Sequence, residues 1–230
     1  MLYLSHCLAA DTPRYGNSGA LELKQTKCLQ CGDTSNNTDL LFGAHTGTHI
    51  DAPLHFDPEG APLESFPPEF WICEHPWLIE QEATPGEIIG LERWLSALER
   101  VPEDTDLLLV KTGFEQHRAE PGASSTYIFQ NPGFAPEVGL WLRTHRKLRM
   151  IGFDFISLTS YTDRPLGRIA HRAFLAQNPE GASGPLADPI LIVEDMHLAD
   201  LTAVPKRVIV APLRYTSADG APVTVLAELP

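Results

Sequence analysis

Hydrophobic and polar residues follow one another along this chain in a pattern that predicts short strands with a few helices between them. Continuous apolar runs at 107–110, 150–153 and 190–193 are typical of strands that are buried on both faces of a sheet. Shorter apolar segments predict further strands at 2–5, 21–26, 39–43, 208–210 and 223–226. The last two are expected to pair around a turn at Asp219-Gly220. Helical spacing of apolar residues predicts helices at 91–98, 136–144 and 165–175.

The order of these elements favours one fold class. A chain of 230 residues is long enough for one well-cored domain, whereas two compact domains would be small. No internal repeat, low-complexity tract or linker interrupts the pattern. We therefore predict one mixed α/β domain that spans residues 1–230.

The densest group of metal-capable side chains is the segment His45-Thr-Gly-Thr-His49-Ile-Asp51-Ala-Pro-Leu-His55. Glycine, proline and β-branched residues within it disfavour a helix. In an extended segment the four odd positions 45, 49, 51 and 55 would project to one side. Imidazole and carboxylate groups together suit Zn²⁺, Mn²⁺ or Fe²⁺. Three histidines can also fall together by chance in a polar loop.

The residues before this segment favour the metal-site interpretation. Leu40-Leu41-Phe42 reads as a buried strand, so the polar residues begin where a hydrophobic strand ends. Sites in α/β proteins are usually built at such positions.

Charge narrows the classes of partner. Lys and Arg number 17 against 30 Asp and Glu, which gives a net charge of −13. Nucleic acids and anionic membranes attract basic surfaces, so we expect neither as a partner. The N-terminus lacks a signal-peptide pattern, and no segment has the length of a membrane span. We expect a cytoplasmic protein that acts on a small molecule.

Cys28-Leu-Gln-Cys31 offers a weaker signal. It matches half of a zinc ribbon, but such a site needs a second pair, and Cys7 and Cys73 stand alone. A redox pair is the other alternative. We expect reduced and largely inert thiols.

The spacing H-x-G-T-H-x-D-x-P-x-H resembles the signature of the cyclase family, which includes bacterial kynurenine formamidase (arylformamidase) and isatin hydrolase. All seven fixed positions of that signature are present between His45 and His55. Further similarity lies in residues 4–6, 11–13, 111–113, 131–134, 151–154, 171–175 and 189–194. The resemblance covers nearly the whole chain, and it implies the swivelling β/β/α type of mixed sheet.

The resemblance also implies roles for individual residues. His45, His49 and Asp51 would hold a first ion, and Asp51 would bridge to a second ion held by His171 and Glu194. The ions would be zinc first and manganese second, one or two per chain. His55 resembles the general base and acid of the family.

The residues alone leave some of these roles open. His171 lies at the edge of the apolar stripe Leu166, Ile169, Ala170, Ala173 and Phe174, and by itself reads as a partly buried histidine rather than a ligand. Glu194 ends the run Ile-Leu-Ile-Val, where a carboxylate is costly to bury unless it is paired or bound to metal.

The sequence offers weaker evidence that several other residues belong to the site. His197 can reach the same ion by its spacing from Glu194, and His6 matches a landmark of the family. Tyr161, Arg164 and Arg168 are candidates to meet a carboxylate on the substrate.

The expected reaction is hydrolysis of an aryl formamide by hydroxide bound to the metal. The best-known substrate of the family is N-formylkynurenine, of tryptophan catabolism. No G-x-S-x-G nucleophile elbow is present. Ring opening of a lactam, lactone or isatin, cyclisation on the same scaffold, and metal binding without catalysis are the alternatives. We expect a homodimer or homotetramer. The Gly/Pro/Ser-rich segment 177–188, between two expected ligands, is either a lid over the pocket or a surface loop.

Overall fold

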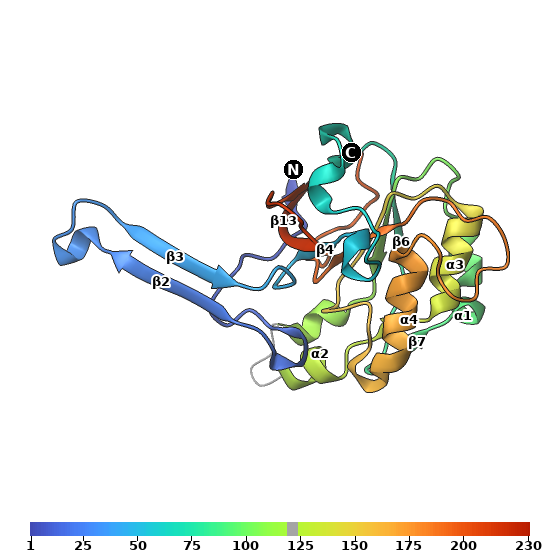
Figure 1. Cartoon of the computed structure of the whole chain (residues 1–230), viewed down its shortest axis with the longest axis horizontal. Coiled ribbons are helices and arrows are strands. Elements are labelled where there is room, and N and C mark those ends of the chain that lie inside the picture. The colour runs from blue at the N-terminus through green and yellow to red at the C-terminus, as the bar shows by residue number, and fades with distance from the viewer. Residues whose placement is uncertain (119–123) are drawn as a thin grey trace.

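A large mixed sheet organises the molecule, and the computed structural model describes it over residues 1–118 and 124–230 (Figure 1). In spatial order its strands are β5 (Ile72–Cys73), β12 (Arg207–Pro212), β13 (Gly220–Glu228), β4 (His49–Asp51), β11 (Leu191–Glu194), β10 (Met150–Phe153), β8 (Leu107–Lys111) and β6 (Pro76–Glu80), with β1 (Leu2–Tyr3) paired to β13. The predicted mixed α/β fold is confirmed. The predicted pairing of 208–210 with 223–226 is also confirmed, as β12 against β13.

The centre of the sheet shows why its strands are continuously apolar. β11, β10, β8 and β6 run parallel to one another. In β8, Leu108 and Val110 belong to one hydrophobic cluster, while Leu107 and Leu109 belong to a second cluster. Each face of the strand is therefore buried, and a polar residue on either face would lose its water.

The helices contribute mainly to one of these two clusters, whose members include Trp94, Leu142 and Phe174. They are α1 (Leu91–Leu98), α2 (Ser124–Phe129), α3 (Pro136–His145) and α4 (Arg164–Leu175). No helix in the described ranges is long and apolar enough to cross a membrane.

α4 begins and is oriented by identifiable residues. The Asp163 side chain accepts a hydrogen bond from the Leu166 N–H at 3.1 Å, and Pro165 occupies the first turn. Ala170 and Phe174 are fully buried. Ile169, in contrast, is 41 % exposed, so the predicted apolar stripe is wrong at that position.

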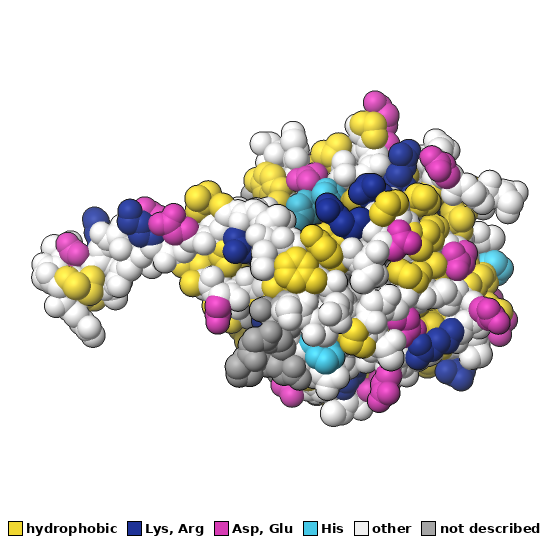
Figure 2. Space-filling view, turned by 90° about the horizontal axis from the view of Figure 1, so that it is seen from below, with side chains coloured by type: hydrophobic (Ala, Val, Ile, Leu, Met, Phe, Trp, Pro, Cys, Tyr) yellow, Lys and Arg dark blue, Asp and Glu magenta, His cyan; other side chains and the backbone are white. Residues whose placement is uncertain are grey.

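A two-stranded arm projects from the body, as Figures 1 and 2 show. It consists of β2 (Leu21–Lys27) and β3 (Asn37–Phe42), and Cys28 and Cys31 lie near its tip as free thiols. The prediction that residues 40–42 form a buried strand is wrong, because Leu40 and Leu41 are each 57 % exposed. A second small sheet pairs β7 (Ile88–Ile89) with β9 (Gly133–Phe134).

Candidate metal centre

β4 places two of the predicted ligands on one side of the sheet. His49 and Asp51 flank Ile50, whose side chain is fully buried in the apolar core. The His49 Nε2 atom lies 3.5 Å from Asp51 Oδ1. His45, however, lies in the turn before β4, and His55 ends the 3₁₀ helix Pro53–His55. The expected single extended segment is therefore wrong, although all four residues face the same cluster.

Two other elements bring the remaining predicted residues to β4. β11 runs antiparallel to β4 and sets Glu194 opposite His49, with Glu194 Oε2 3.3 Å from His49 Nε2. From α4, His171 Nε2 lies 3.4 Å from Glu194 Oε1 and 3.6 Å from Asp51 Oδ2. His49, Asp51, His171 and Glu194 are all buried. The structure therefore brings four of the five predicted ligands together in one buried cluster.

The hydrogen bonds of the two buried histidines orient their lone pairs. His49 Nδ1 lies 2.8 Å from the Gly47 carbonyl oxygen, and His171 Nδ1 lies 2.9 Å from the Gly167 carbonyl oxygen. A carbonyl accepts only, so each Nδ1 carries hydrogen and each Nε2 of the neutral ring carries a lone pair. Both Nε2 atoms face carboxylate oxygens, and acceptors so close together need a proton or a metal ion between them.

A glycine makes this arrangement of His171 sterically feasible. A Cβ atom on Gly167 would lie 2.3 Å from the Thr159 Cγ2 atom. Thr159 Oγ1 in turn lies 3.0 Å from His171 Nδ1. The close approach of α4 to Thr159 therefore fixes the orientation of the His171 ring through its Nδ1 atom.

The electrostatics agree with a cationic occupant. Burial alone would lower the pKa of His49 and His171, but Glu194 and Asp51 outweigh it and raise the pKa of both rings. For His45, Asp51 and Asp219 likewise overcome burial and raise the pKa to about 9. The carboxylates thus attract either protons to these rings or a metal ion between them.

One group of metal-capable side chains joins His45, His55 and Asp219, and two further overlapping groups of donor atoms hold the predicted ligands. Of these two, one is His45, His49 and Asp51, and the other is Asp51, His171 and Glu194, with the donor atoms of each within 4.8 Å of one another. Asp51 belongs to both, as expected of a bridging ligand. Imidazole nitrogen and carboxylate oxygen are the donors that zinc and manganese accept in proteins.

Asp219 is a member of the site that sequence reasoning missed. Its Oδ2 atom lies 2.9 Å from His45 Nε2 and 3.1 Å from His55 Nδ1, and the His45 and His55 rings stack at 3.9 Å. The sequence gives Asp219 only as part of a turn, far from the histidine segment. Gly220 is required beside it, because a Cβ atom there would lie 2.3 Å from His45 Cε1.

A cavity of about 360 Å³ opens over these groups. Arg14, Tyr15, Arg164 and Arg168 line it together with Phe56 and Ile156. Figure 2 shows Lys or Arg side chains gathered next to histidines on one face of the molecule. Arg164 and Arg168, the two arginines expected to meet a substrate carboxylate, both line this cavity, and that role stays a prediction. Tyr161 instead packs against Tyr15, with the ring centroids 5.4 Å apart.

Two weaker expectations are wrong. His6 and His197 do not reach the metal cluster, because both belong to a separate group with Glu115.

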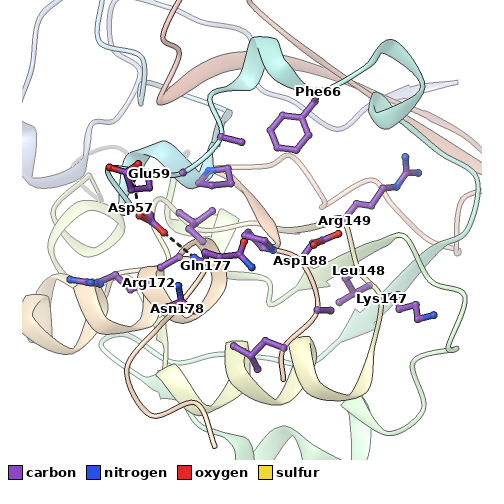
Figure 3. A pocket seen from close by; sticks show the side chains of 18 of the residues that line it. Asp57, Glu59, Phe66, Lys147, Leu148, Arg149, Arg172, Gln177, Asn178 and Asp188 are labelled. Carbon is purple, nitrogen blue, oxygen red and sulfur yellow. Dashed lines mark hydrogen bonds between the residues drawn. The ribbon is translucent and has the colours of Figure 1, made fainter. Parts of the chain in front are cut away.

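The segment 177–188 does not line the cavity over the metal cluster, although its Glu180 lines a neighbouring cavity together with His55, Phe56 and Arg168. It lines another cavity, of about 880 Å³, which Figure 3 shows in close view. The Gln177 N–H donates to Asp57 Oδ2 at 2.9 Å, and Arg143 donates to the Ala187 carbonyl oxygen at 2.9 Å. These contacts hold the two ends of the segment against the body beside α4, and its role as a lid stays a prediction.

Comparison with known proteins gives a consistent picture. The profile of the family described as "Putative cyclase" matches residues 2–160. "Cyclase-like protein 2" of Oryza sativa subsp. japonica is 26 % identical over 231 residues, covering 97 % of this chain and 77 % of the relative.

Solved structures share the fold at low sequence identity. Isatin hydrolase A from Labrenzia aggregata superposes with a TM-score of 0.74 at 20 % identity, over 99 % of this chain and 93 % of the other. A protein described as a potential metal-dependent hydrolase with cyclase activity superposes with a TM-score of 0.71 at 21 % identity, over 98 % of this chain and 96 % of the other.

Proposed function

This chain belongs to the cyclase family, and we propose that it is a metal-dependent amidohydrolase that cleaves the C–N bond of an aryl formamide. The observation that carries the proposal is the pair of Nε2 lone pairs, on His49 and His171, that face the carboxylates of Asp51 and Glu194. A divalent ion would satisfy four buried groups arranged in this way, and Zn²⁺ or Mn²⁺ suits them.

The proposed reaction adds water to the formyl carbon, breaks the bond to the aryl nitrogen and releases formate and an arylamine. A bound divalent ion would lower the pKa of a water molecule and polarise the carbonyl group. His45, His49, Asp51, His171 and Glu194 would hold the ion or ions.

His55 is placed to move the protons of this reaction. Asp219 binds its Nδ1 atom and so holds the ring, while Nε2 makes no hydrogen bond within the described ranges. Burial, with the charges of His45 and His171, lowers the pKa of His55. A neutral imidazole can take a proton from water at Nε2 and return it to the leaving nitrogen.

The cavity lining supports an acidic, aromatic substrate. Arg14, Arg164 and Arg168 bring three positive charges to one opening of a chain whose net charge is −13. Phe56, stacked on the His171 ring at 4.4 Å, and Ile156 offer apolar contact for an aryl group. Cavities of this size accept small bicyclic molecules.

Ring opening of a cyclic amide is the second candidate. Solved structures that share this fold include isatin hydrolases, and a cyclic amide has the same C–N bond to break. Neither the donor atoms nor the proton carrier would have to differ.

A panel of substrates tests the proposal. Purified protein would be assayed with N-formylated arylamines with and without a carboxylate, with isatin and with lactones, before chelation, after it and after restoring Zn²⁺ or Mn²⁺. We expect hydrolysis of an acidic aryl formamide that disappears on chelation and returns with metal. His75→Ala, on an exposed histidine paired with Asp104, serves as control. Turnover of isatin alone would support the second candidate, and no metal-dependent turnover of any amide would contradict both.

A further inference from the structure

A second group of metal-capable side chains lies outside the proposed catalytic site. It consists of His6, which follows β1, Glu115 in the 3₁₀ helix Phe114–Arg118, and His197, which follows β11. Their donor atoms lie within 4.8 Å of one another, and His6 Nε2 is 3.7 Å from Glu115 Oε1. We propose that this group is a separate binding site for a divalent transition-metal ion, zinc above all.

The hydrogen bonds of His197 carry the first step of the argument. Its Nε2 atom lies 3.1 Å from Asp200 Oδ2, to which it donates. A neutral ring then has its lone pair on Nδ1, and Nδ1 contacts Glu115 Oε1. Two acceptors in contact need a proton or a metal ion to join them. A carboxylate on the far nitrogen is the usual partner of a metal-binding histidine.

His6 decides between the proton and the metal ion. Its Nε2 atom is buried and has no hydrogen-bond partner in the described part of the chain. Its ring lies 5.1 Å from the His197 ring, and Nε2 points to the same oxygen of Glu115. A proton shared by His197 and Glu115 leaves this buried nitrogen unsatisfied, which is unfavourable. A metal ion among the three side chains would satisfy all three donors.

Glu115 is held ready for this role. Its Oε2 atom accepts hydrogen bonds from the Leu198 and Ala199 N–H groups at 2.7 and 2.8 Å. Oε1 is thereby turned toward His6 and His197. The nearby Arg118 forms an ion pair with Asp195 instead, and its Nε and Nη2 atoms donate to Asp195 Oδ1 and Oδ2 at 2.8 and 3.1 Å.

Thr48 separates this site from the catalytic cluster and also connects the two. The His6 N–H donates to Thr48 Oγ1 at 2.9 Å, and Thr48 Oγ1 donates to the Asp195 carbonyl oxygen at 2.5 Å. His49 directly follows Thr48 in the sequence, and Glu194 directly precedes Asp195. An ion at the second site would therefore join the N-terminal segment to the end of β11 directly behind the catalytic ligands, which is a structural role.

Zinc binding in a protein that lacks two of the five proposed catalytic ligands tests the proposal. In a His49→Ala/His171→Ala background, we expect about one zinc ion per chain after loading and dialysis, and a rise of Tm on adding zinc. Adding His6→Gln, or separately His197→Gln, should abolish both effects. Adding His75→Ala instead should change neither.

Three results would overturn the proposal. In the first, the background protein binds no zinc. In the second, the zinc that it binds stays in place in the His6→Gln and His197→Gln variants. In the third, its Tm does not respond to zinc. The first result, with His197 found doubly protonated by NMR, would assign the group to an ion pair of His197 with Glu115 and Asp200. Because zinc content and Tm are measured rather than turnover, each outcome is independent of whether the proposed hydrolysis occurs.

Discussion

At the scale of single residues, His55 differs from its neighbours by its place at the rim of the cluster. Its ring stacks on His45 and is held by Asp219, while His49 and His171 are buried with their Nε2 atoms toward carboxylates. His55 thus lies outside the four buried donors, and we propose that it carries protons, although it also forms a group of metal-capable side chains with His45 and Asp219.

Replacing His55 tests this proposal. His55→Ala should leave the metal content nearly intact and lower kcat by roughly 10²–10⁴-fold, because only the proton transfer is removed. Elemental analysis beside steady-state kinetics measures both quantities. Loss of metal in this variant would make His55 a ligand and refute its assigned role.

The pH profile tests the same residue in another way. His55 accepts a proton only when neutral, and its pKa lies below the ordinary value of about 6.5. We expect kcat/KM to be constant near neutral pH and to fall as pH drops through this lowered pKa. The negative charge of Asp219 raises the pKa of His55, so Asp219→Asn should move the acid limb to lower pH. A limb that moves to higher pH would contradict the assignment.

Arg168 tests the proposed substrate class. Arg168→Gln removes one of three positive charges that line the cavity. We expect KM to rise about tenfold for a substrate with a carboxylate, which corresponds to about 1.4 kcal/mol, and to change little for a neutral formamide. An equal change for both substrates would show that Arg168 acts on the fold rather than on the acid group.

At the scale of elements, the arm of β2 and β3 projects from the body and carries an apolar face. Leu21 lies opposite Phe42 and Leu23 opposite Leu40, so four apolar side chains share one face of the hairpin. An isolated two-stranded hairpin is only marginally stable in water. We propose that this face packs against another copy of the chain in the homodimer or homotetramer expected from the sequence.

Light scattering on arm variants tests this proposal. Leu23→Lys/Leu40→Lys should give the mass of one chain, since charges on this face disfavour burial. Glu22→Gln, on the opposite face of β2, should keep the mass of the wild type. A monomeric wild type, or an oligomer that survives both lysines, would contradict the role of the arm.

The elements also show what the sequence could and could not predict. β8, β10 and β11 were predictable because both of their faces are buried. Every position of such a strand must be apolar, so the apolar run in the sequence indicates a buried strand. Residues 40–42 have a similar run, yet they lie on the arm, and composition does not distinguish a core from an unpaired face. Asp219 was unpredictable because it meets His45 through the pairing of β13 with β4, which joins residues far apart in the sequence.

At the scale of the whole molecule, β4, β11, α4 and the turn before β13 each contribute to one buried cluster. β4 and β11 pair antiparallel, which sets His49 opposite Glu194, and α4 brings His171 against both carboxylates. The sheet thus fixes the distances between donors before any ion binds, which is the preorganisation that tight binding requires.

The central claim is that this cluster binds a divalent transition metal, and metal content measures it most directly. In a His6→Gln/His197→Gln background, which removes the second proposed site, elemental analysis should find about one or two zinc or manganese ions per chain. Adding His49→Ala should remove most of this metal, and adding His75→Ala should not. A background protein that holds no transition metal after loading, or a His49→Ala variant that keeps all of it, would contradict the claim.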